Sequence, residues 1–235
     1  MNMPAAYTVL RPHAEIVTEF ARKRSRFLTV MRRADSAEAA QELVDELRRE
    51  HHSARHHCSA WALGPDRHIQ RANDDGEPSG TAGAPMLEAL SKAEMPSGAA
   101  DLSDAVVVVV RWFGGTLLGA GGLVGAYSDS VVNAVEHAQR DSLLILRRRM
   151  RTFSLEAPVT EAGRWENELR GAETPSAGIT VLGADYVGRP GSAMLSLAVP
   201  DSDEPLDRLT AQVAALSAGQ ATLQDCGTGW VDAPG

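Results

Sequence analysis

The 235-residue sequence has only two cysteines, Cys58 and Cys226, and they lie in different halves of the chain. So low a count excludes a disulfide framework and is typical of a protein from a reducing compartment. No apolar run approaches the roughly 20 residues of a membrane-spanning helix, and the N-terminus lacks the charged start and apolar core of a signal peptide. We therefore expect a cytoplasmic protein without membrane contacts.

Common catalytic and phosphate-binding motifs are also missing. No Lys-Ser/Thr pair follows a G-x-x-x-x-G spacing, and Val124 stands where a dinucleotide-binding loop beginning at Gly119-x-Gly121 would have its third glycine. There is no G-x-S-x-G nucleophile elbow, and the sequence identifies no electropositive setting for Cys58. The sequence therefore gives little support to nucleophilic catalysis, a Walker A loop or a Rossmann fingerprint.

The charge of the chain is uneven. Its net charge is −8, yet through Arg151 there are 19 Lys and Arg against 19 Asp and Glu, and the remainder has 4 against 12. A chain with this net charge does not bind phosphate backbones indiscriminately, so any contact with nucleic acid must be local. The basic run Arg147-Arg148-Arg149 is either an exposed strand face or such a contact.

The most informative segment spans residues 106–125, where five valines and Arg-Trp-Phe lead into a loop with six glycines among residues 114–125. Five β-branched residues without polar alternation predict a strand covered on both faces, and a helix is expected from about Gly122 to Ala138. Because glycines permit positive φ or close approach, and a helix start attracts anions, the loop can hold a phosphate. The candidate ligand or phosphate-binding residues are Gly114, Gly115, Gly119, Gly121 and Gly122.

A second glycine-rich segment, residues 74–83, runs directly into a predicted helix from Ala84 to Met95. Ser79, Gly80 and Thr81 present hydroxyls and amides at this helix start. They are either capping residues or contacts to a phosphate or substrate.

The acidic cluster Asp74, Asp75 and Glu77 also has two interpretations. Its carboxylates either shape a turn or bind a ligand, with magnesium as the candidate ion, because magnesium prefers carboxylates together with water and phosphate oxygens. Arg111 ends the valine strand and must pair with a negative group there. Its partner is either a carboxylate of this cluster or an external phosphate or carboxylate.

His56, His57 and Cys58 suggest a metal site at first sight. Neighbouring strand residues point to opposite faces, and no second Cys-x-x-Cys or His-x-x-x-His pair completes a zinc site, so we predict no metal at these three residues. The two histidines are expected to pack beside the glycine loops. Trp112 and Phe113 are expected to be core residues, although one could be exposed as a base-stacking platform.

The order of predicted elements indicates an α+β protein with two domains. Residues 1–140 follow a β-β-α-β-β-α-β-α pattern, residues 141–226 follow β-α-β-β-α-β, and residues 227–235 are expected to form a loose tail. Within the first pattern, a basic turn at residues 22–26 joins two strands, and its Lys23, Arg24 and Arg26 are candidate nucleic-acid contacts. The following helix should bury the stripe Ala40, Leu43, Val44 and Leu47.

The sequence resembles the YigZ/IMPACT family of cytoplasmic proteins. The resemblance rests on KRSRF at 23–27, ARHHCSAW at 54–61, DDGEPSGTAG at 74–83 and VVVRWFGG at 108–115 continuing to Leu118-Gly119. It implies a first domain like the second domain of ribosomal protein S-five and a ferredoxin-like second domain resembling elongation factor G domains, as in the bacterial two-domain members. It also implies that His56 or His57 is a site residue, because the Arg-His-His-Cys motif recurs in that family.

From the resemblance we expect a non-enzymatic protein that binds RNA, the ribosome or a translation-associated protein and regulates translation. The alternative is an enzyme or sensor that holds a phosphorylated small molecule in the cleft of the glycine loops. An enclosed pocket lined by Arg111 and the loops favours the small molecule, whereas an open surface continuing onto residues 22–26 favours RNA. The sequence leaves the ligand and the oligomeric state open.

Overall fold

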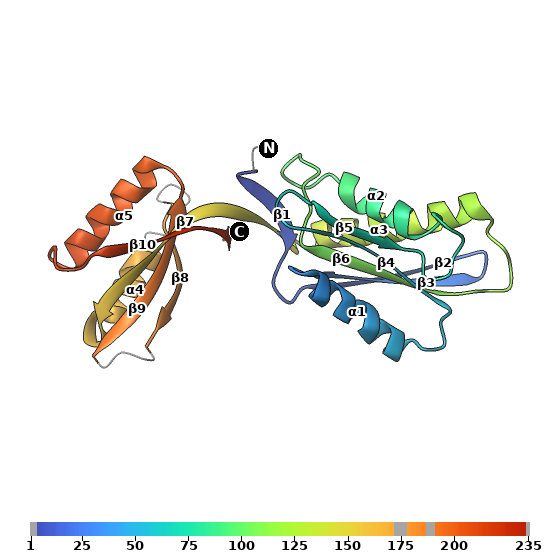
Figure 1. The fold of residues 1–235 in the computed structure, drawn as a ribbon, viewed down its shortest axis with the longest axis horizontal. Helices are drawn as coiled ribbons and strands as arrows, with labels where there is room; N and C mark the ends of the chain where they lie inside the picture. The colour runs from blue at the N-terminus through green and yellow to red at the C-terminus, as the bar shows by residue number, and fades with distance from the viewer. Residues whose placement is uncertain (1–3, 172–177, 187–190, 234–235) are drawn as a thin grey trace. The chain divides into compact units, whose positions relative to one another are not determined.

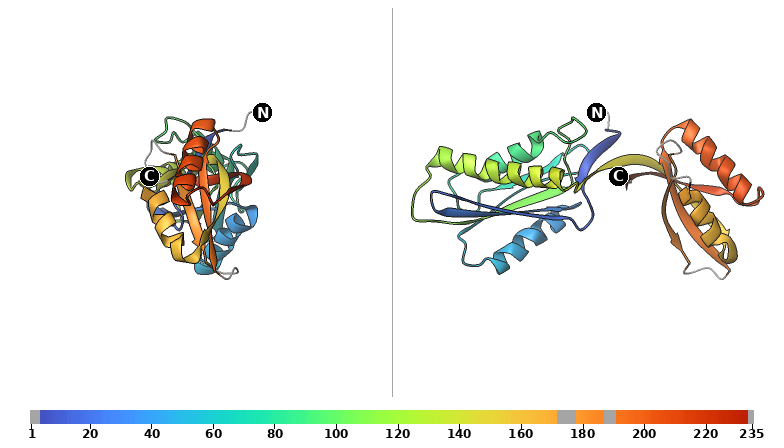
Figure 2. Two further views of the ribbon diagram at one scale, coloured as in Figure 1. Left: turned by 90° about the vertical axis from the view of Figure 1, so that its left-hand side faces the viewer. Right: turned by 180° about the vertical axis from the view of Figure 1, so that it is seen from behind.

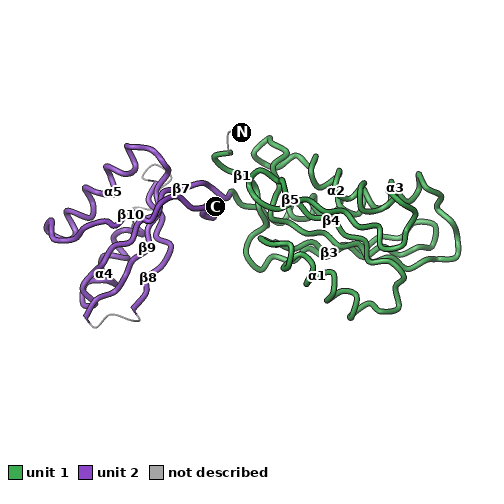
Figure 3. Tube along the Cα trace, viewed as in Figure 1, with its two compact units in different colours: residues 1–146, 234–235 green, residues 147–233 purple. Residues whose placement is uncertain are grey.

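The computed structural model describes residues 4–171, 178–186 and 191–233, which form two compact units (Figures 1 and 3). Unit 1 extends to Leu146 and unit 2 runs from Arg147 to Ala233. The boundary thus lies beyond the predicted position at residue 140. The reason is that Leu143 and Leu144 pack against the core of unit 1, and the Arg11 amide donates to the Leu143 carbonyl at 2.8 Å.

Unit 1 contains a five-stranded antiparallel sheet in the order β2-β3-β6-β4-β5. α1 covers one face of this sheet, and α2 and α3 cover the other, as Figure 1 and the right-hand view of Figure 2 show. The strand β1 lies outside this sheet and was not predicted. The elements are β1 (Ala6–Leu10), β2 (Glu15–Arg22), β3 (Ser25–Arg33), α1 (Ala37–Glu50), β4 (His56–Leu63), β5 (Ile69–Asn73), α2 (Gly83–Lys92), β6 (Ala105–Trp112) and α3 (Ala120–Arg140).

The valine strand β6 is the centre of unit 1, and the prediction that it is buried on both faces is confirmed. Val106, Val108 and Val110 pack toward α1, whereas Val107 and Val109 pack toward α2 and α3. All five are fully buried. Each such side chain contributes roughly 1.5–3 kcal/mol of burial free energy, so β6 fixes the sandwich of helices and sheet.

The helix α1 forms as the sequence predicts. Ser36 is its N-cap, and the Ser36 hydroxyl accepts a hydrogen bond from the Ala39 amide at 3.1 Å. Such a cap satisfies one of the amides that a helix start leaves without a partner. The expected apolar stripe is buried against the sheet and consists of Ala40, Leu43, Val44 and Leu47.

Unit 2 has the predicted β-α-β-β-α-β order, with antiparallel strands arranged β10-β7-β9-β8. Its core lies between one face of this sheet and the helices. The sequence pattern predicts its second strand over Gly178–Val187, whereas β8 covers Thr180–Asp185, and Val187 lies outside the described residues. The elements are β7 (Leu144–Pro158), α4 (Val159–Gly171), β8 (Thr180–Asp185), β9 (Ser192–Pro200), α5 (Asp203–Leu216) and β10 (Leu223–Asp232).

The C-terminal segment corrects the sequence analysis. Residues 227–235 were expected to form a loose tail, yet β10 continues to Asp232 and pairs with β7 from Thr228 onward. Val231 joins Met150 and Ala198 in a small buried cluster, which gives this part of the strand an apolar anchor. Across the part of the chain that the structure describes, no helix is both long and apolar enough to cross a membrane.

Candidate functional site

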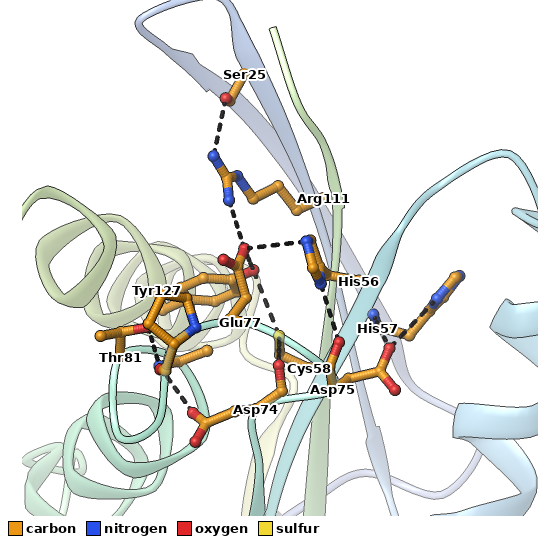
Figure 4. Close-up of polar contacts among 12 residues, drawn as sticks. Ser25, His56, His57, Cys58, Asp74, Asp75, Glu77, Thr81, Arg111 and Tyr127 are labelled. Atoms are coloured by element: carbon orange, nitrogen blue, oxygen red, sulfur yellow. Dashed lines mark hydrogen bonds and ion pairs between the residues drawn. The ribbon is translucent and has the colours of Figure 1, made fainter. Parts of the chain in front are cut away.

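Glu77 lies at the centre of a buried polar cluster between β4, β6 and α3 (Figure 4). Its Oε1 accepts hydrogen bonds from Arg111 Nη1 at 2.5 Å and from the Tyr127 hydroxyl at 2.8 Å. His56 Nε2 lies 4.0 Å from the same oxygen. The side chains of Glu77 and Arg111 are only 3% and 6% exposed, so Arg111 pairs with an internal carboxylate.

The remaining contacts of Arg111 also point inward. Its Nη2 donates to the Ser25 hydroxyl at 3.3 Å, and the guanidinium carbon lies 5.5 Å from the Phe27 ring centroid and 5.7 Å from that of Phe113. Its buried Nε has no hydrogen-bond partner among the described residues. An external phosphate would have to displace Glu77 from a buried charge-assisted hydrogen bond, which is far stronger than an exposed one.

Cys58 and Tyr127 complete this cluster. The Cys58 thiol donates toward the Asp74 carbonyl at 3.0 Å and toward the Tyr127 hydroxyl at 3.3 Å. Burial raises the pKa of the Cys58 thiol and of the Tyr127 hydroxyl above their usual ranges, so both stay protonated at neutral pH. Because the thiolate is the nucleophile, this thiol is unreactive in the folded chain.

The carboxylate of Asp74 lies at the start of α2. Its Oδ1 accepts from the amides of Ala82 and Gly83 at 3.0 and 2.8 Å, and its Oδ2 accepts from the Gly80 amide at 2.8 Å. Burial alone would raise the pKa of Asp74, but these three donors together lower it. Of the two roles left open for the amides at the start of α2, capping or contact to a phosphate, the structure has them hold a carboxylate of the chain itself.

The two hydroxyls of the same loop lie in different surroundings. Thr81 is buried, and its hydroxyl donates to the Pro78 carbonyl at 2.6 Å, which closes the loop. Ser79 is exposed and has no hydrogen-bond partner among the described residues. Gly83 is required by close packing, because a Cβ there would lie 2.5 Å from the Asn73 amide nitrogen.

Asp75 links the 74–83 loop to β4 and to Arg48 of α1. Its Oδ2 accepts from the His57 amide and its Oδ1 from Arg48 Nη2, both at 2.6 Å, while its carbonyl lies 2.9 Å from His56 Nδ1. His57 points away from Cys58, so the two faces of β4 separate them as predicted. Burial lowers the pKa of His57, with the Asp75 carboxylate partly opposing the shift. Its buried Nε2 lacks a hydrogen-bond partner in the described part of the chain.

The acidic cluster does not converge on a common point. Asp74 caps α2, Asp75 binds Arg48 and the β4 backbone, and Glu77 binds Arg111. Each carboxylate is thus satisfied by protein donors, which is a poor fit to a magnesium site. Nowhere in residues 4–171, 178–186 and 191–233 do three or more His, Cys, Asp or Glu side chains gather as a metal ion would need.

The candidate residues of the basic turn and of the glycine loop meet at one end of unit 1. There the β2–β3 turn and the loop between β6 and α3 lie together (Figure 1). Arg22 pairs with Ser25, so the turn consists of Lys23 and Arg24 alone, with φ of 45° and 67°. A Cβ on Gly114 would lie 2.1 Å from the carbonyl carbon and oxygen of Arg24. The loop backbone therefore packs directly against the turn, and only glycine fits.

The cationic side chains in and beside this turn differ in whether a carboxylate of the chain binds them. Arg22 forms an ion pair with Asp129 at 2.5 Å, and Arg26 pairs with Glu19 at 2.8 Å. Lys23 and Arg24 are exposed, and neither side chain has a hydrogen-bond or ion-pair partner among the described residues. Two cations are thus free to meet an external anion.

The adjoining loop exposes apolar side chains. Phe113 is 43% and Leu117 is 81% exposed, whereas Trp112 is half-buried beneath the Arg26 guanidinium, whose carbon lies 4.4 Å from the indole centroid. The sequence analysis expected one aromatic to be exposed at most, and Phe113 is that residue. We call Lys23, Arg24, Phe113, Leu117 and the glycine loop 114–122 the tip surface.

The glycines of the tip surface leave bare backbone. A Cβ at Gly115, Gly119 or Gly121 would meet no heavy atom within 4 Å, and Gly119 begins α3 without a side-chain cap. Gly122 is different, because a Cβ there would lie 3.1 Å from Leu118 Cβ. The loop therefore packs against neighbouring residues at Gly114 and Gly122, whereas at the other three glycines a side chain would meet only open space.

Three surface hollows lie away from both places. One of about 450 Å³ runs between α2 and α3 and includes Ala89, Val124 and Val132. Two others of about 490 Å³ lie on α1 and at the start of β2. None of these three is lined by Glu77, by Arg111 or by the tip surface.

The arginines of β7 belong to unit 2 and are partly neutralised there. Arg151 pairs with Asp225 at 2.5 Å, and Arg147 lies 3.6 Å from Asp232. Arg148 and Arg149 are exposed. This agrees with a solvated strand face and makes the run a useful reference for charge effects.

Known proteins match the part of the chain that carries these features. The sequence pattern of the Impact N-terminal domain matches residues 23–135, from the β2–β3 turn into α3. A protein of Thermus thermophilus named "IMPACT family member in pol 5'region" is 37% identical over 148 residues, which are 63% of this chain and 73% of that relative. The chain belongs to the IMPACT family.

Other IMPACT family relatives are closer in identity but share less of their length. YvyE of Bacillus subtilis is 44% identical over 156 residues, 66% of this chain and 65% of YvyE. YigZ of Escherichia coli is 47% identical over 128 residues, 54% of this chain and 59% of YigZ. The match therefore spans less than two thirds of either relative.

A crystal structure of a hypothetical protein is similar to this chain, with a TM-score of 0.59 and 32% sequence identity. The similarity covers 94% of this chain and 97% of that one.

Proposed function

We propose that this IMPACT family protein binds RNA through the tip surface of unit 1 and has no enzymatic activity. The observation that carries the proposal is the pair of exposed, unpaired cations Lys23 and Arg24, which the packing of Gly114 holds in one place. Beside them lie bare backbone and the exposed ring of Phe113. Cations combined with an aromatic ring are the usual means of holding a nucleic-acid strand.

The buried cluster supports a binding role over catalysis. Arg111, which the small-molecule alternative needs as a phosphate ligand, is bound to Glu77 inside the unit. Asp74, which that alternative assigns to magnesium or a proton, caps α2. The Cys58 thiol is buried and protonated. The hydrogen bonds of this cluster join β4, β6, α3 and the 74–83 loop, so we assign it the role of positioning the tip.

We further propose that the RNA belongs to the translation apparatus, either on the ribosome or beside a translation-associated protein, in the cytoplasm. Two features support this setting. The antiparallel order β10-β7-β9-β8 of unit 2 is that expected for a ferredoxin-like domain of the elongation factor type, and we infer an S-five-like fold for unit 1. Cys226 is exposed and unpaired, which suits a reducing compartment.

RNA binding at the tip is tested by fluorescence anisotropy with labelled ribosomal RNA fragments across a salt series. The variant Lys23→Gln/Arg24→Gln removes two charges from the tip, and the matched control Arg148→Gln/Arg149→Gln removes two exposed charges from unit 2. We expect the tip variant to lose most of its binding and the control to keep it. Equal losses in both variants would mean unspecific attraction, and absence of binding by the wild type at low salt would refute the proposal.

A further inference from the structure

The free charge of the tip surface is too small to recognise a duplex by its phosphates. Of the cations at this end of unit 1, only Lys23 and Arg24 lack partners among the described residues, because Arg22, Arg26 and Arg111 are each bound to a carboxylate. Two phosphate contacts to a single strand give a salt slope of about −1.4, so affinity falls only about sevenfold between 50 and 200 mM salt. Duplex RNA is recognised by shape and by backbone contacts across about 16 base pairs, which needs a wider basic face.

The remaining binding energy must come from contacts that do not involve charge, and Phe113 provides such a contact. Phe113 is 43% exposed as a residue, while the buried guanidinium carbon of Arg111 lies 5.7 Å from its ring centroid. Arg111 is in turn fixed by Glu77. Phe113 is therefore supported from inside by Arg111 and partly exposed to solvent, as a stacking platform must be. Base stacking on an aromatic ring strengthens binding by about 5- to 150-fold per base.

The backbone beside Phe113 permits a strand to approach closely. Gly115 and Gly119 have φ of 82° and 77°, and neither would bring a Cβ near any other atom. The loop therefore leaves bare backbone at both glycines, with the exposed residues Thr116 and Leu117 between them. A nucleotide can approach the backbone at Gly115 and Gly119.

We propose that the tip surface recognises unpaired RNA nucleotides, with one base stacked on Phe113 and the flanking phosphates bound by Lys23 and Arg24. This inference rests on the RNA-binding function proposed above and specifies the form of RNA that is bound. In duplex RNA the base faces are covered by their neighbours, so Phe113 gains nothing there. Unpaired loops, bulges and ends expose those faces.

Four labelled probes test the inference by fluorescence anisotropy: a 12-nucleotide oligo(A), a 12-nucleotide oligo(U), an abasic strand of the same length and a blunt duplex of 18 base pairs. The abasic strand has the phosphates without the bases. We expect the wild type to bind oligo(A) most tightly and the abasic strand and duplex at least about fivefold more weakly, since one stacked base contributes that much. Phe113→Ala should lower affinity for oligo(A) about 5- to 150-fold and leave the abasic strand unchanged.

Two further variants separate stacking from folding. Phe113→Tyr keeps a ring and should keep the binding, and Leu117→Ala removes an exposed side chain from the same loop and should change it less than Phe113→Ala. Equal affinity for duplex and oligo(A), or no effect of Phe113→Ala, would overturn the stacking inference. The proposed function itself would survive that result if Lys23→Gln/Arg24→Gln still abolished binding. Absence of binding to all four probes would refute both.

Discussion

The ion pair between Glu77 and Arg111 can be tested by a double-mutant cycle. Glu77→Gln leaves the guanidinium buried without a counter-charge, and Arg111→Met leaves the carboxylate buried with the Tyr127 hydroxyl as its remaining close donor. In the double variant the glutamine still accepts from Tyr127, and methionine fills the space of the arginine stem. Neither group is then charged.

The expected magnitudes follow from the geometry of the pair. With 2.5 Å between the charged atoms and exposures of 3% and 6%, water cannot replace the missing partner. Removing one member of such a pair costs about 3–5 kcal/mol of unfolding free energy, whereas neutralising both costs much less. We expect the double variant to be at least about 2 kcal/mol more stable than the sum of the single effects implies.

Hydrogen exchange followed by mass spectrometry measures this change in unit 1 alone. Amides of β6 should exchange about two to four orders of magnitude faster in each single variant, and amides of β9 in unit 2 provide an internal reference. The matched control is Arg151→Met, which removes an arginine from the exposed pair with Asp225 and should leave β6 unchanged. Additive effects of Glu77→Gln and Arg111→Met, or wild-type exchange in both, would refute the assignment of Arg111 to an internal partner.

Three further predictions concern burial in unit 1. Burial lowers the pKa of His57 in the folded chain, so the stability that neutral His57 contributes is present above the unfolded pKa of about 6.5 and is lost as pH falls through the lower folded pKa. The urea midpoint should therefore fall less between pH 7 and pH 5 in His57→Gln than in the wild type. Identical slopes in the two proteins would contradict this. Ellman's reagent should titrate one thiol, Cys226, in the native chain and both thiols only after unfolding, so a native count of two would show Cys58 to be accessible. Gly114→Ala should destabilise unit 1 by about 1–3 kcal/mol, because its Cβ would meet the turn backbone. Gly121→Ala, whose Cβ would lie in open space, should have little effect on the urea midpoint. Equal urea midpoints of the two variants would exclude the close packing at Gly114.

Local patterns predicted the elements well. The β6 valines and the α1 stripe were identified because burial on one or two faces leaves a periodic signature in the sequence itself. The β10 extension was missed because Gly227 and Gly229 weaken the strand pattern. Its structure comes from pairing with β7, a partner distant in sequence.

Sequence reasoning left the contacts among the candidate site residues open. It offered Arg111 either a carboxylate of the 74–77 cluster or an external anion as its partner. Glu77 lies 34 positions from Arg111 in the sequence, and only the packing of the 74–83 loop on β6 decides the pairing. Asp74 was expected either to shape a turn or to bind a ligand, and its partners in the structure are the amides of its own loop. Tyr127 was not named at all, because a tyrosine within a helix pattern reads as a core residue.

The conformation of the β2–β3 turn has a consequence for how this surface can vary. Lys23 and Arg24 both adopt left-handed backbone conformations, which cost a side-chain-bearing residue roughly 1–2 kcal/mol each and which Asn-Gly adopts readily. An Asn-Gly turn would thus make a more stable hairpin with no free cation. Selection for stability alone would favour replacing Lys23 and Arg24, so their presence in a strained turn marks this hairpin as a place where stability and binding oppose each other.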